Sequence, residues 1–426
     1  MDDIEKLRQQ AKDYRQNNNY REAKDCYQEI IDRTSPQIDK WDGWGYGYCL
    51  RKLGNNLKAL EIAKKVYKID PDFRYNNNIL GWAIYDLKMK IDPEDVVDEN
   101  EFLQSARYIL KITEQEKYSA YTQTVFTVVR YLFKKNRNPE QINDLLDRLV
   151  KNNLPEDNLN KRFSSKLEKW YLAKSKALSK MERYEDCLAI SEEGLNNITN
   201  FTNDNQFWLR YRKAWSKGEI GYQDESISEL KELLKYKREW YIQYYIARLL
   251  FQQEKYSEAK SYALNAALND GKYKVKVNLY KLMSKILYES ETEIAREHLC
   301  LLLKIKEENE WSVSGETKYM INKYELKEID LSAYNLYQKL KKYWEKEKYK
   351  EMPLKSGEVV NIIADGRAGF IREEGGEEYY FKAKNFSGNN RQLSSGLKVN
   401  FYLIPSYDRK KEEETMMAVN INQIEV

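Results

Sequence analysis

A pattern of small and aromatic residues recurs between residue 1 and about residue 305, at a spacing of roughly 34 residues. In each copy a helical segment carries a small residue, an aromatic residue marks a turn, and a second helical segment carries further small residues. The copy within residues 240–268 has Ala247, Tyr256 and Ala259 in these places. A fixed period of this length is typical of stacked helical pairs, each of which contacts only its neighbours. The sequence therefore predicts a mainly α-helical solenoid.

The spacing resembles that of the tetratricopeptide repeat (TPR) family, in which the two helices of a unit pack closely against small residues. Six units follow the pattern, and a Lys-Ile-Asp-Pro-Asp sequence typical of TPR turns closes the second unit at residues 68–72. The pattern is lost over residues 72–160, where an insertion around Ile91–Asn100 lengthens one unit and Tyr118–Leu149 forms a helical pair without the signature. The resemblance implies a TPR-like array over residues 1–327, with its register left open in the irregular region.

The TPR resemblance also implies a concave groove lined by the first helix of each pair. The family's groove positions, carried over unit by unit, fall on aromatic residues with interspersed arginines. Aromatic and arginine side chains dominate binding hot spots, and aromatic rings also stack on single-stranded bases. We expect a groove for a peptide or for stacked bases; the alternative is that the rings pack between neighbouring helices. The predicted groove residues are Trp41, Trp44, Tyr48, Arg51, Tyr75, Trp82, Trp208, Tyr211, Trp215, Tyr241, Tyr244 and Arg248.

The C-terminal segment changes its apolar period from about 3.6 to about 2 after Pro353. A lysine-rich helical stretch over residues 328–352 is expected to cap the array and to link it to this segment. Short runs of β-branched and aromatic residues then alternate with glycine-containing turns, which predicts strands. Five short strands in about 70 residues fit a small OB-type β-barrel over residues 353–426. The expected strands cover residues 357–363, 367–372, 378–382, 396–403 and 416–421.

This segment resembles the cold-shock domain, a small barrel of the OB type. In that family, alternate residues of the first three strands present aromatic rings on which single-stranded bases stack. The family's short motifs recur here in the same order: Gly357-Glu-Val359, Gly369-Phe-Ile371, Glu378-Tyr-Tyr-Phe-Lys382, Gly396-Leu-Lys-Val-Asn-Phe401 and Ala418-Val-Asn-Ile421.

The departures from the cold-shock pattern fall on the stacking face. Two of the family's rings are missing, at Asn361 and Ala368, and the family's histidine corresponds to Lys382. The resemblance thus implies a weakened face for single strands. Its rings are expected to point outward, because the intervening residues of the same strands alternate toward the core. The candidate nucleic-acid-binding residues are Arg367, Phe370, Tyr380 and Lys382, and the residues expected to face the core are Ile371, Tyr379 and Phe381.

Several kinds of chemistry lack their usual residues. The four cysteines, Cys26, Cys49, Cys187 and Cys300, form no C-x-x-C pair, which predicts reduced, buried thiols rather than a zinc site. The single histidine, His298, excludes a metal centre with several histidines and lies in a helical pattern, where a structural role is expected. The sequence contains no glycine-rich phosphate-binding motif. We therefore expect no enzymatic activity, no cofactor and no bound metal.

Charge and hydropathy limit the partners and the cellular location that the sequence predicts. It has 72 basic and 68 acidic side chains, a net charge of +4, which argues against a nucleic-acid binder driven by net charge alone. No run approaches about 18 consecutive apolar residues, so no transmembrane helix is expected. The N-terminal residues lack the features of a secretion signal. These features favour a cytoplasmic protein without membrane contacts and leave its oligomeric state open.

Two functional hypotheses follow. The first is a non-enzymatic adaptor that binds single-stranded nucleic acid, RNA before DNA, through the cold-shock-like domain and binds a protein or peptide in the TPR groove. The second is a scaffold for proteins only, with a degenerate OB-type barrel. The order of a TPR array and a cold-shock-like domain also resembles accessory proteins of bacterial anti-phage conflict systems, which implies a role in antiviral defence.

Overall fold

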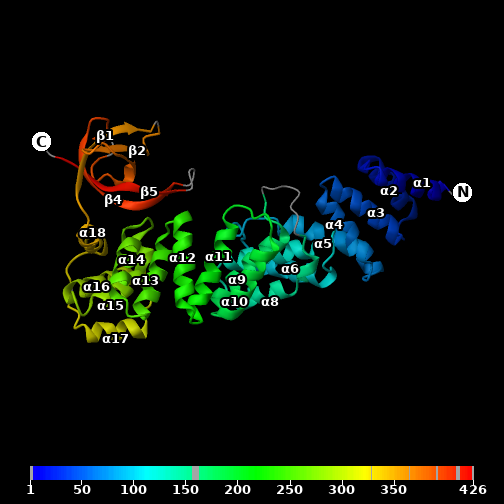
Figure 1. Ribbon diagram of the computed structural model, residues 1–426. Coiled ribbons are helices and arrows are strands. Elements are labelled where there is room, and N and C mark those ends of the chain that lie inside the picture. Colours follow the sequence, from blue (N-terminus) through cyan, green and yellow to red (C-terminus); the bar gives the residue numbers. More distant parts are fainter. Residues whose placement is uncertain are drawn as a thin grey trace. The chain divides into compact units, whose positions relative to one another are not determined.

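The computed structural model describes residues 3–155, 163–327, 329–363, 365–389, 392–408 and 413–424. The chain divides into two compact units, Met1–Ser216 and Lys217–Val426, and each is described by itself. Helices form the first unit and the first part of the second, and five strands follow them (Figure 1). This order confirms the predicted fold class, an α-solenoid followed by a small five-stranded domain.

Consecutive helices of the first unit pack side by side as pairs. The small residues predicted to lie between paired helices are fully buried, among them Ala23, Ala59 and Cys187. Small side chains at these points let the helices approach closely. The helices are α1 (Asp3–Gln16), α2 (Tyr20–Thr34), α3 (Lys40–Lys52), α4 (Asn56–Ile69), α5 (Arg74–Lys88), α6 (Glu99–Ile112), α7 (Tyr121–Lys134), α8 (Pro139–Asp147), α9 (Lys166–Lys180), α10 (Tyr184–Asn197) and α11 (Asn205–Glu219), with a 3₁₀ turn at Lys151–Asn153 and the last residues of α11 in the second unit.

The turns within the pairs repeat one backbone geometry. A residue with positive φ follows the first helix, and the next backbone N–H donates to the carbonyl five residues earlier, as from Asn55 to Leu50 at 2.9 Å. This ending satisfies carbonyl groups that the helix leaves free. Glycine adopts positive φ without steric cost, yet other residues also occupy the position. The positive-φ residues in these turns are Asn18, Gly54, Asn136, Glu182, Gly221 and Glu254.

The irregular region keeps the helical packing of its neighbours. The insertion lengthens the connection between α5 and α6, and Asp98 ends it by accepting the backbone N–H of Glu101 at 2.9 Å. Helices α7 and α8 form the pair that lacks the repeat signature. One hydrophobic cluster includes Leu80 of α5, Ile109 of α6 and Val125 of α7. The insertion therefore leaves the core of the first unit continuous.

The helices of the second unit end with α18, which packs against α14 and α16. The helix expected over residues 328–352 thus begins at Ala333 and ends at Tyr349. The helices are α12 (Gln223–Tyr236), α13 (Trp240–Gln252), α14 (Tyr256–Leu268), α15 (Val277–Leu287), α16 (Thr292–Glu308), α17 (Gly315–Lys323) and α18 (Ala333–Tyr349), with a 3₁₀ turn at Tyr273–Lys276.

A buried hydrogen-bonded pair fixes α18 on α16. The indole Nε1 of Trp344 donates to Nε2 of His298 at 2.8 Å, and Nδ1 of His298 lies 2.7 Å from the carbonyl oxygen of Ile294. Because an indole nitrogen can only donate, the imidazole is neutral with its proton on Nδ1. Both side chains are fully buried, and the Trp344 ring stacks on Tyr280. His298 therefore has a structural role in this unit.

The five strands pair in the order β1-β2-β3-β5-β4 and close into a barrel through β1 and β4. The β3–β5 pair is parallel, and the other pairs are antiparallel. Ile371 and Phe381 are fully buried in the barrel core and Tyr379 packs against it, which confirms the predicted alternation. The strands are β1 (Lys355–Ile362), β2 (Ala368–Glu373), β3 (Glu378–Lys382), β4 (Lys398–Asp408) and β5 (Glu413–Gln423), with a 3₁₀ turn at Ala383–Asn385.

Across the described ranges, no helix is long and apolar enough to cross a membrane. The same residues include no group of three or more His, Cys, Asp or Glu side chains placed to hold a metal ion. No disulfide joins cysteines in the described part of the chain; Cys49, Cys187 and Cys300 are buried, and Cys26 is half-buried.

Candidate binding surfaces

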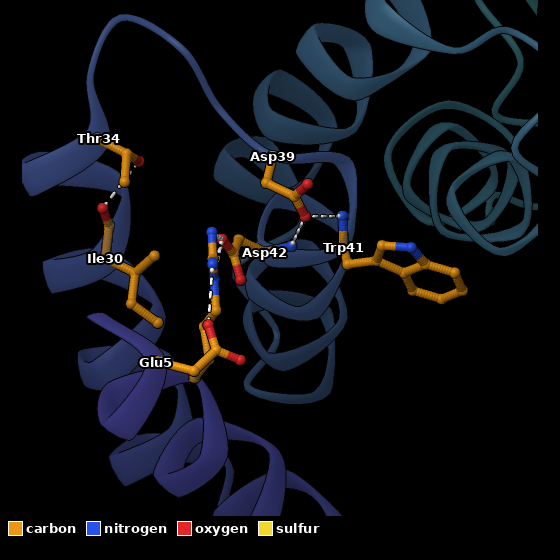
Figure 2. Close-up of polar contacts among 7 residues, drawn as sticks. Glu5, Ile30, Thr34, Asp39, Trp41 and Asp42 are labelled. Atoms are coloured by element: carbon orange, nitrogen blue, oxygen red, sulfur yellow. Dashed lines mark hydrogen bonds and ion pairs between the residues drawn. The ribbon is translucent and has the colours of Figure 1, made fainter. Parts of the chain in front are cut away.

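The first predicted groove residues lie on α3 and α5. Helix α3 begins after Asp39, whose carboxylate accepts the backbone N–H groups of Trp41 at 2.8 Å and Asp42 at 3.3 Å (Figure 2). Trp41, Trp44 and Tyr48 then share one face, because residues three and four positions apart are neighbours on a helix. Figure 2 shows the Trp41 ring pointing away from Asp42, whose carboxylate pairs with Arg8 at 2.9 Å. The capping carboxylate thus sets where the aromatic face begins.

The other side of α3 is shaped for close packing. A Cβ atom added at Gly45 would collide with the Tyr27 ring of α2, and one added at Gly43 would collide with Val66 of α4. Glycine inside a helix costs about 1 kcal/mol relative to alanine. The close approach of α2 and α4 accounts for glycine at these two places. Helix α3 therefore packs closely against α2 and α4, and this packing holds its aromatic face in place.

The name aromatic surface is used here for five side chains of α3 and α5, four of which are joined by ring contacts. The ring centroids of Trp41 and Trp44 lie 5.8 Å apart, and Tyr75 lies 5.6 Å from Trp41 and 5.7 Å from Trp44. These distances are typical of favourable aromatic contacts. Trp41 keeps 49% and Tyr75 keeps 58% of its surface exposed. The members of the aromatic surface are Trp41, Trp44, Tyr48, Tyr75 and Trp82.

Two arginines lie over these rings and differ in their partners. The guanidinium of Arg15, on α1, lies 4.5 Å from the Trp44 centroid and 5.7 Å from that of Tyr48. No carboxylate within the described ranges pairs with it. Arg51 lies 4.8 Å from the Trp82 centroid and pairs with Asp86 at 3.6 Å. Burial lowers the pKa of Arg51, and Asp86 opposes this shift. Arg15 is thus a cation of this surface that has no carboxylate partner among the described residues.

The predicted residues of α11 form a separate row in the first unit. Tyr211 contacts Trp208 at 6.1 Å and Trp215 at 5.7 Å between ring centroids. Tyr211 is buried, with 8% of its surface exposed, whereas Trp208 is exposed and Trp215 is half-buried. Tyr211 therefore lies among the rings of its own helix, whereas Trp208 keeps an exposed surface.

The predicted residues of α13 belong to the second unit. Tyr241 and Tyr244 are half-buried and contact Trp240, at 6.2 and 6.3 Å between centroids. Arg248 pairs with Glu219 and lies 4.5 Å from the Tyr245 ring. Its charge is thus compensated within its own unit, in contrast to that of Arg15.

On the barrel, paired residues of adjacent strands form a row across the outer face. The register places Asn361 beside Phe370, Phe370 beside Tyr380, and Tyr380 beside Met417. The Phe370 and Tyr380 rings are half-buried and meet edge to face at 5.8 Å. The cold-shock family has an aromatic ring at the position of Ala368. Ala368 is buried and offers no ring at this position. The row therefore offers two rings, with Asn361 at its exposed end.

The two predicted basic residues flank this row at the surface. Lys382 is exposed at the end of β3, and Arg367 is exposed just before β2, 3.7 Å from Asp365. On the same two strands Arg372 pairs with Glu378 at 2.7 Å. Both sides of the row thus carry basic side chains at the surface, and Arg367 and Arg372 each lie near a carboxylate.

The other end of the row is covered by the chain itself. Tyr349, the last residue of α18, stacks on Tyr402 of β4 with centroids 4.7 Å apart. Tyr349, Met417 and Val419 are buried together outside the barrel core, and Tyr380 packs against this cluster. Sequence reasoning missed this cover. The signal was the run Met416-Met-Ala-Val419: an unbroken apolar run indicates a strand buried on both faces.

Comparisons with known proteins agree with the helical repeats. The family model of the tetratricopeptide repeat matches residues 8–72, which include most of α1 and all of α2 to α4. TPR repeats are modules of protein–protein interaction. No curated protein matches the sequence.

Solved structures resemble the chain at low sequence identity. A tetratricopeptide repeat protein from Parabacteroides merdae is 14% identical over 75% of this chain and 98% of its own, with a TM-score of 0.29. Human IFIT1, solved as a dimer with m7Gppp-AAAA, is 13% identical over 80% of this chain and 79% of its own, with a TM-score of 0.38. The TPR protein TTC0263 from Thermus thermophilus is 13% identical over 58% of this chain and 99% of its own, with a TM-score of 0.20.

Proposed function

We propose that this protein is a non-enzymatic adaptor whose aromatic surface binds an extended segment of a partner protein. One observation carries this function: Trp41 and Tyr75 stay about half exposed although they contact each other and Trp44. Exposed apolar clusters mark interaction sites, and tryptophan and tyrosine dominate the binding energy at such sites. The TPR match over α2 to α4 supports a protein as the partner.

Arg15 indicates which chemical group the partner contributes to this site. Its guanidinium lies on Trp44 and Tyr48 with no carboxylate beside it in the described part of the chain. A carboxylate of the partner would complete this site while apolar side chains of the same segment cover the exposed rings. Charge-assisted hydrogen bonds to a guanidinium are the stronger kind, so this contact would fix the register of the segment.

A displayed random-peptide library tests this function. Peptides selected on the wild-type chain should lose at least about tenfold in affinity on the Trp44→Ala chain, and again on the Arg15→Gln chain. Tyr236→Ala provides the matched control, because Tyr236 is an exposed aromatic residue elsewhere in the chain. Selected peptides that bind the Trp44→Ala chain as well as the wild type would exclude the aromatic surface as their site.

A second function, binding of single-stranded nucleic acid by the barrel, is favoured by the outer row. Phe370 and Tyr380 form a ring pair outside the barrel core, flanked by the exposed Arg367 and Lys382. The closed five-strand order supports the OB-type comparison, and OB-type barrels bind single strands by stacking bases on such rings. Because the cover of Tyr349 reaches the Tyr380 end, Phe370 is the ring most open to a base.

Labelled single-stranded RNA, single-stranded DNA and duplex, titrated at two salt concentrations, test the second function. Phe370→Ala should weaken single-strand binding by roughly 1–3 kcal/mol. Lys382→Ala should reduce the salt dependence by about one counterion if this lysine meets a phosphate. Tyr334→Ala, at an exposed ring of α18, is the control. No binding at low salt would leave the protein-binding adaptor as the whole function.

A further inference from the structure

The insertion between α5 and α6 borders an open hollow of about 580 Å³ beside α7 and α9. One wall is acidic and belongs to the insertion, and the other wall is basic and belongs to the two helices. All of its residues lie in the first unit. The lining residues are Asp92, Pro93, Glu94, Asp95, Arg130, Phe133, Lys134 and Lys176.

The insertion supplies carboxylates to part of the basic wall. Asp92 lies 3.6 Å from the guanidinium of Arg130, which also donates to the carbonyl oxygen of Ile91 at 3.2 Å. Glu94 pairs with Lys134. All four charged side chains are exposed, and exposed ion pairs contribute little to stability. A competing carboxylate could therefore replace those of the insertion at small cost.

Lys176, the remaining basic residue of this wall, pairs with no carboxylate among the described residues. The ammonium of Lys176 lies 4.4 Å from the Phe133 centroid, and the nearby charges of Arg212 and Lys180 are also positive. Arg212 donates to Ser175 Oγ at 3.1 Å, and Lys180 donates to Asn136 Oδ1 at 2.9 Å. None of these three cations pairs with a carboxylate in the described ranges. Burial, together with Arg212 and Lys180, lowers the pKa of Lys176.

We propose that this hollow is a second binding site, which takes an acidic peptide segment of a partner. The segment displaces Asp92 and Glu94 from Arg130 and Lys134 and extends its carboxylates to Lys176. The insertion shows the chemistry that the basic wall accepts, because a peptide carboxylate already occupies it.

A nucleic acid fits this hollow less well than a peptide does. Single strands bind through bases stacked on open aromatic rings. The ring in this hollow is Phe133, and Lys176 already lies over it. The site therefore has cations for an anionic ligand without a free platform for a base.

Fluorescein-labelled hexaglutamate, titrated into the full-length chain, tests the site. Lys176→Gln and Arg130→Gln should each weaken binding about three- to tenfold. The double variant Asp92→Asn with Glu94→Gln should strengthen it by a similar factor, because the internal competitor is removed. Lys65→Gln, an exposed lysine of α4 without an ion pair among the described residues, should leave binding unchanged. Tyr236→Ala, at an exposed ring of α12 in the second unit, should also leave it unchanged.

Three results would overturn the proposal. One is weaker or unchanged hexaglutamate binding in the Asp92→Asn, Glu94→Gln variant. Another is equal loss in the Lys65→Gln control, which would show that binding follows net charge. The third is a labelled uridine decamer that binds more tightly than hexaglutamate and loses affinity with Lys176→Gln, which would make the hollow a nucleic-acid site.

Discussion

The aromatic surface of the first repeats and the outer row of the barrel both carry aromatic and basic residues. The two surfaces differ in how much of them the chain itself covers. On α3 and α5, Trp41 and Tyr75 remain open and Arg15 has no carboxylate partner in the described part of the chain. On the barrel, Tyr380 packs against a cluster that includes Tyr349 of the preceding helix. The first surface is available to a partner as it stands, whereas half of the second is already occupied.

The difference arises from how each fold uses its surfaces. Helical pairs of a solenoid contact only their neighbours, so one face of each first helix has no internal occupant. The outer face of a small barrel can be covered by the chain itself, because the segment that leads into the barrel can fold back on that face. An aromatic residue at a family's binding position therefore predicts a site more safely in a repeat array than in a barrel with a flanking helix.

Removing the cover should have the largest effect on stability. Tyr349→Ala deletes a buried ring that stacks on Tyr402, and we expect it to lower the free energy of unfolding by about 3 kcal/mol. Urea unfolding followed by circular dichroism measures this loss. Tyr334→Ala, at an exposed ring of the same helix, should change it by less than about 0.5 kcal/mol. Equal effects of the two substitutions would show that the cover is not part of the folded barrel.

The docking of α18, which positions this cover, should depend on pH. Complete burial lowers the pKa of His298 from 6.5 to about 4. The unfolded state therefore binds more protons between these values, so stability falls as the pH drops below 6.5 and is constant above it. We expect a loss of about 2 kcal/mol between pH 6.5 and pH 5 in urea unfolding. The His298→Gln chain should lack this slope, and an identical slope in that chain would assign it to other groups.

The two rings of the barrel row should differ when each is removed. Tyr380→Ala should cost about 1 kcal/mol more in unfolding free energy than Phe370→Ala, because Tyr380 packs against the buried cluster and Phe370 lies toward the exposed Asn361. Thermal melts of the two single variants give the comparison. A larger cost for Phe370→Ala would contradict the placement of the cover at the Tyr380 end of the row.

The smallest stability change is expected on the open surface. Trp41→Phe should shift the unfolding free energy by less than about 0.5 kcal/mol. It should also remove a fluorescence component that iodide quenches, because about half of the Trp41 side chain is exposed. Trp344→Phe is the contrasting variant, since its buried indole should contribute an unquenched component. Loss of equal quenchable signal from both variants would contradict the exposure of the aromatic surface.

Much of the fold follows from local pattern in the sequence. The small residues between paired helices, such as Ala59 and Cys187, are buried as the repeat predicts. The turns are harder to predict from the sequence. Glu182 and Glu254 adopt positive φ, although a search for turn glycines would not select these two positions. Helix propensity says little about these positions, since the hydrogen bonds of the turn outweigh the steric cost.

The candidate sites were less accessible to sequence reasoning because they depend on contacts between distant segments. The positions of Trp41, Trp44 and Tyr48 follow from helical spacing, and the structure brings them together. The difference between Arg15 and Arg51 rests on Asp86, which lies in the next repeat. The burial of Tyr380 depends on where α18 ends, and the hollow depends on where the insertion folds. Composition and periodicity do not contain this information.

The hydrogen bond between Trp344 and the single histidine has a practical consequence. Selective ¹⁵N labelling of histidine gives one imidazole spin system, so its spectrum needs no assignment. In the neutral Nδ1–H form described above, the two ring nitrogens resonate far apart, and their shifts follow the contact between α16 and α18. The full-length chain thus carries a site-specific probe of whether the helix next to the barrel is in place, which could be followed while peptides or oligonucleotides are added.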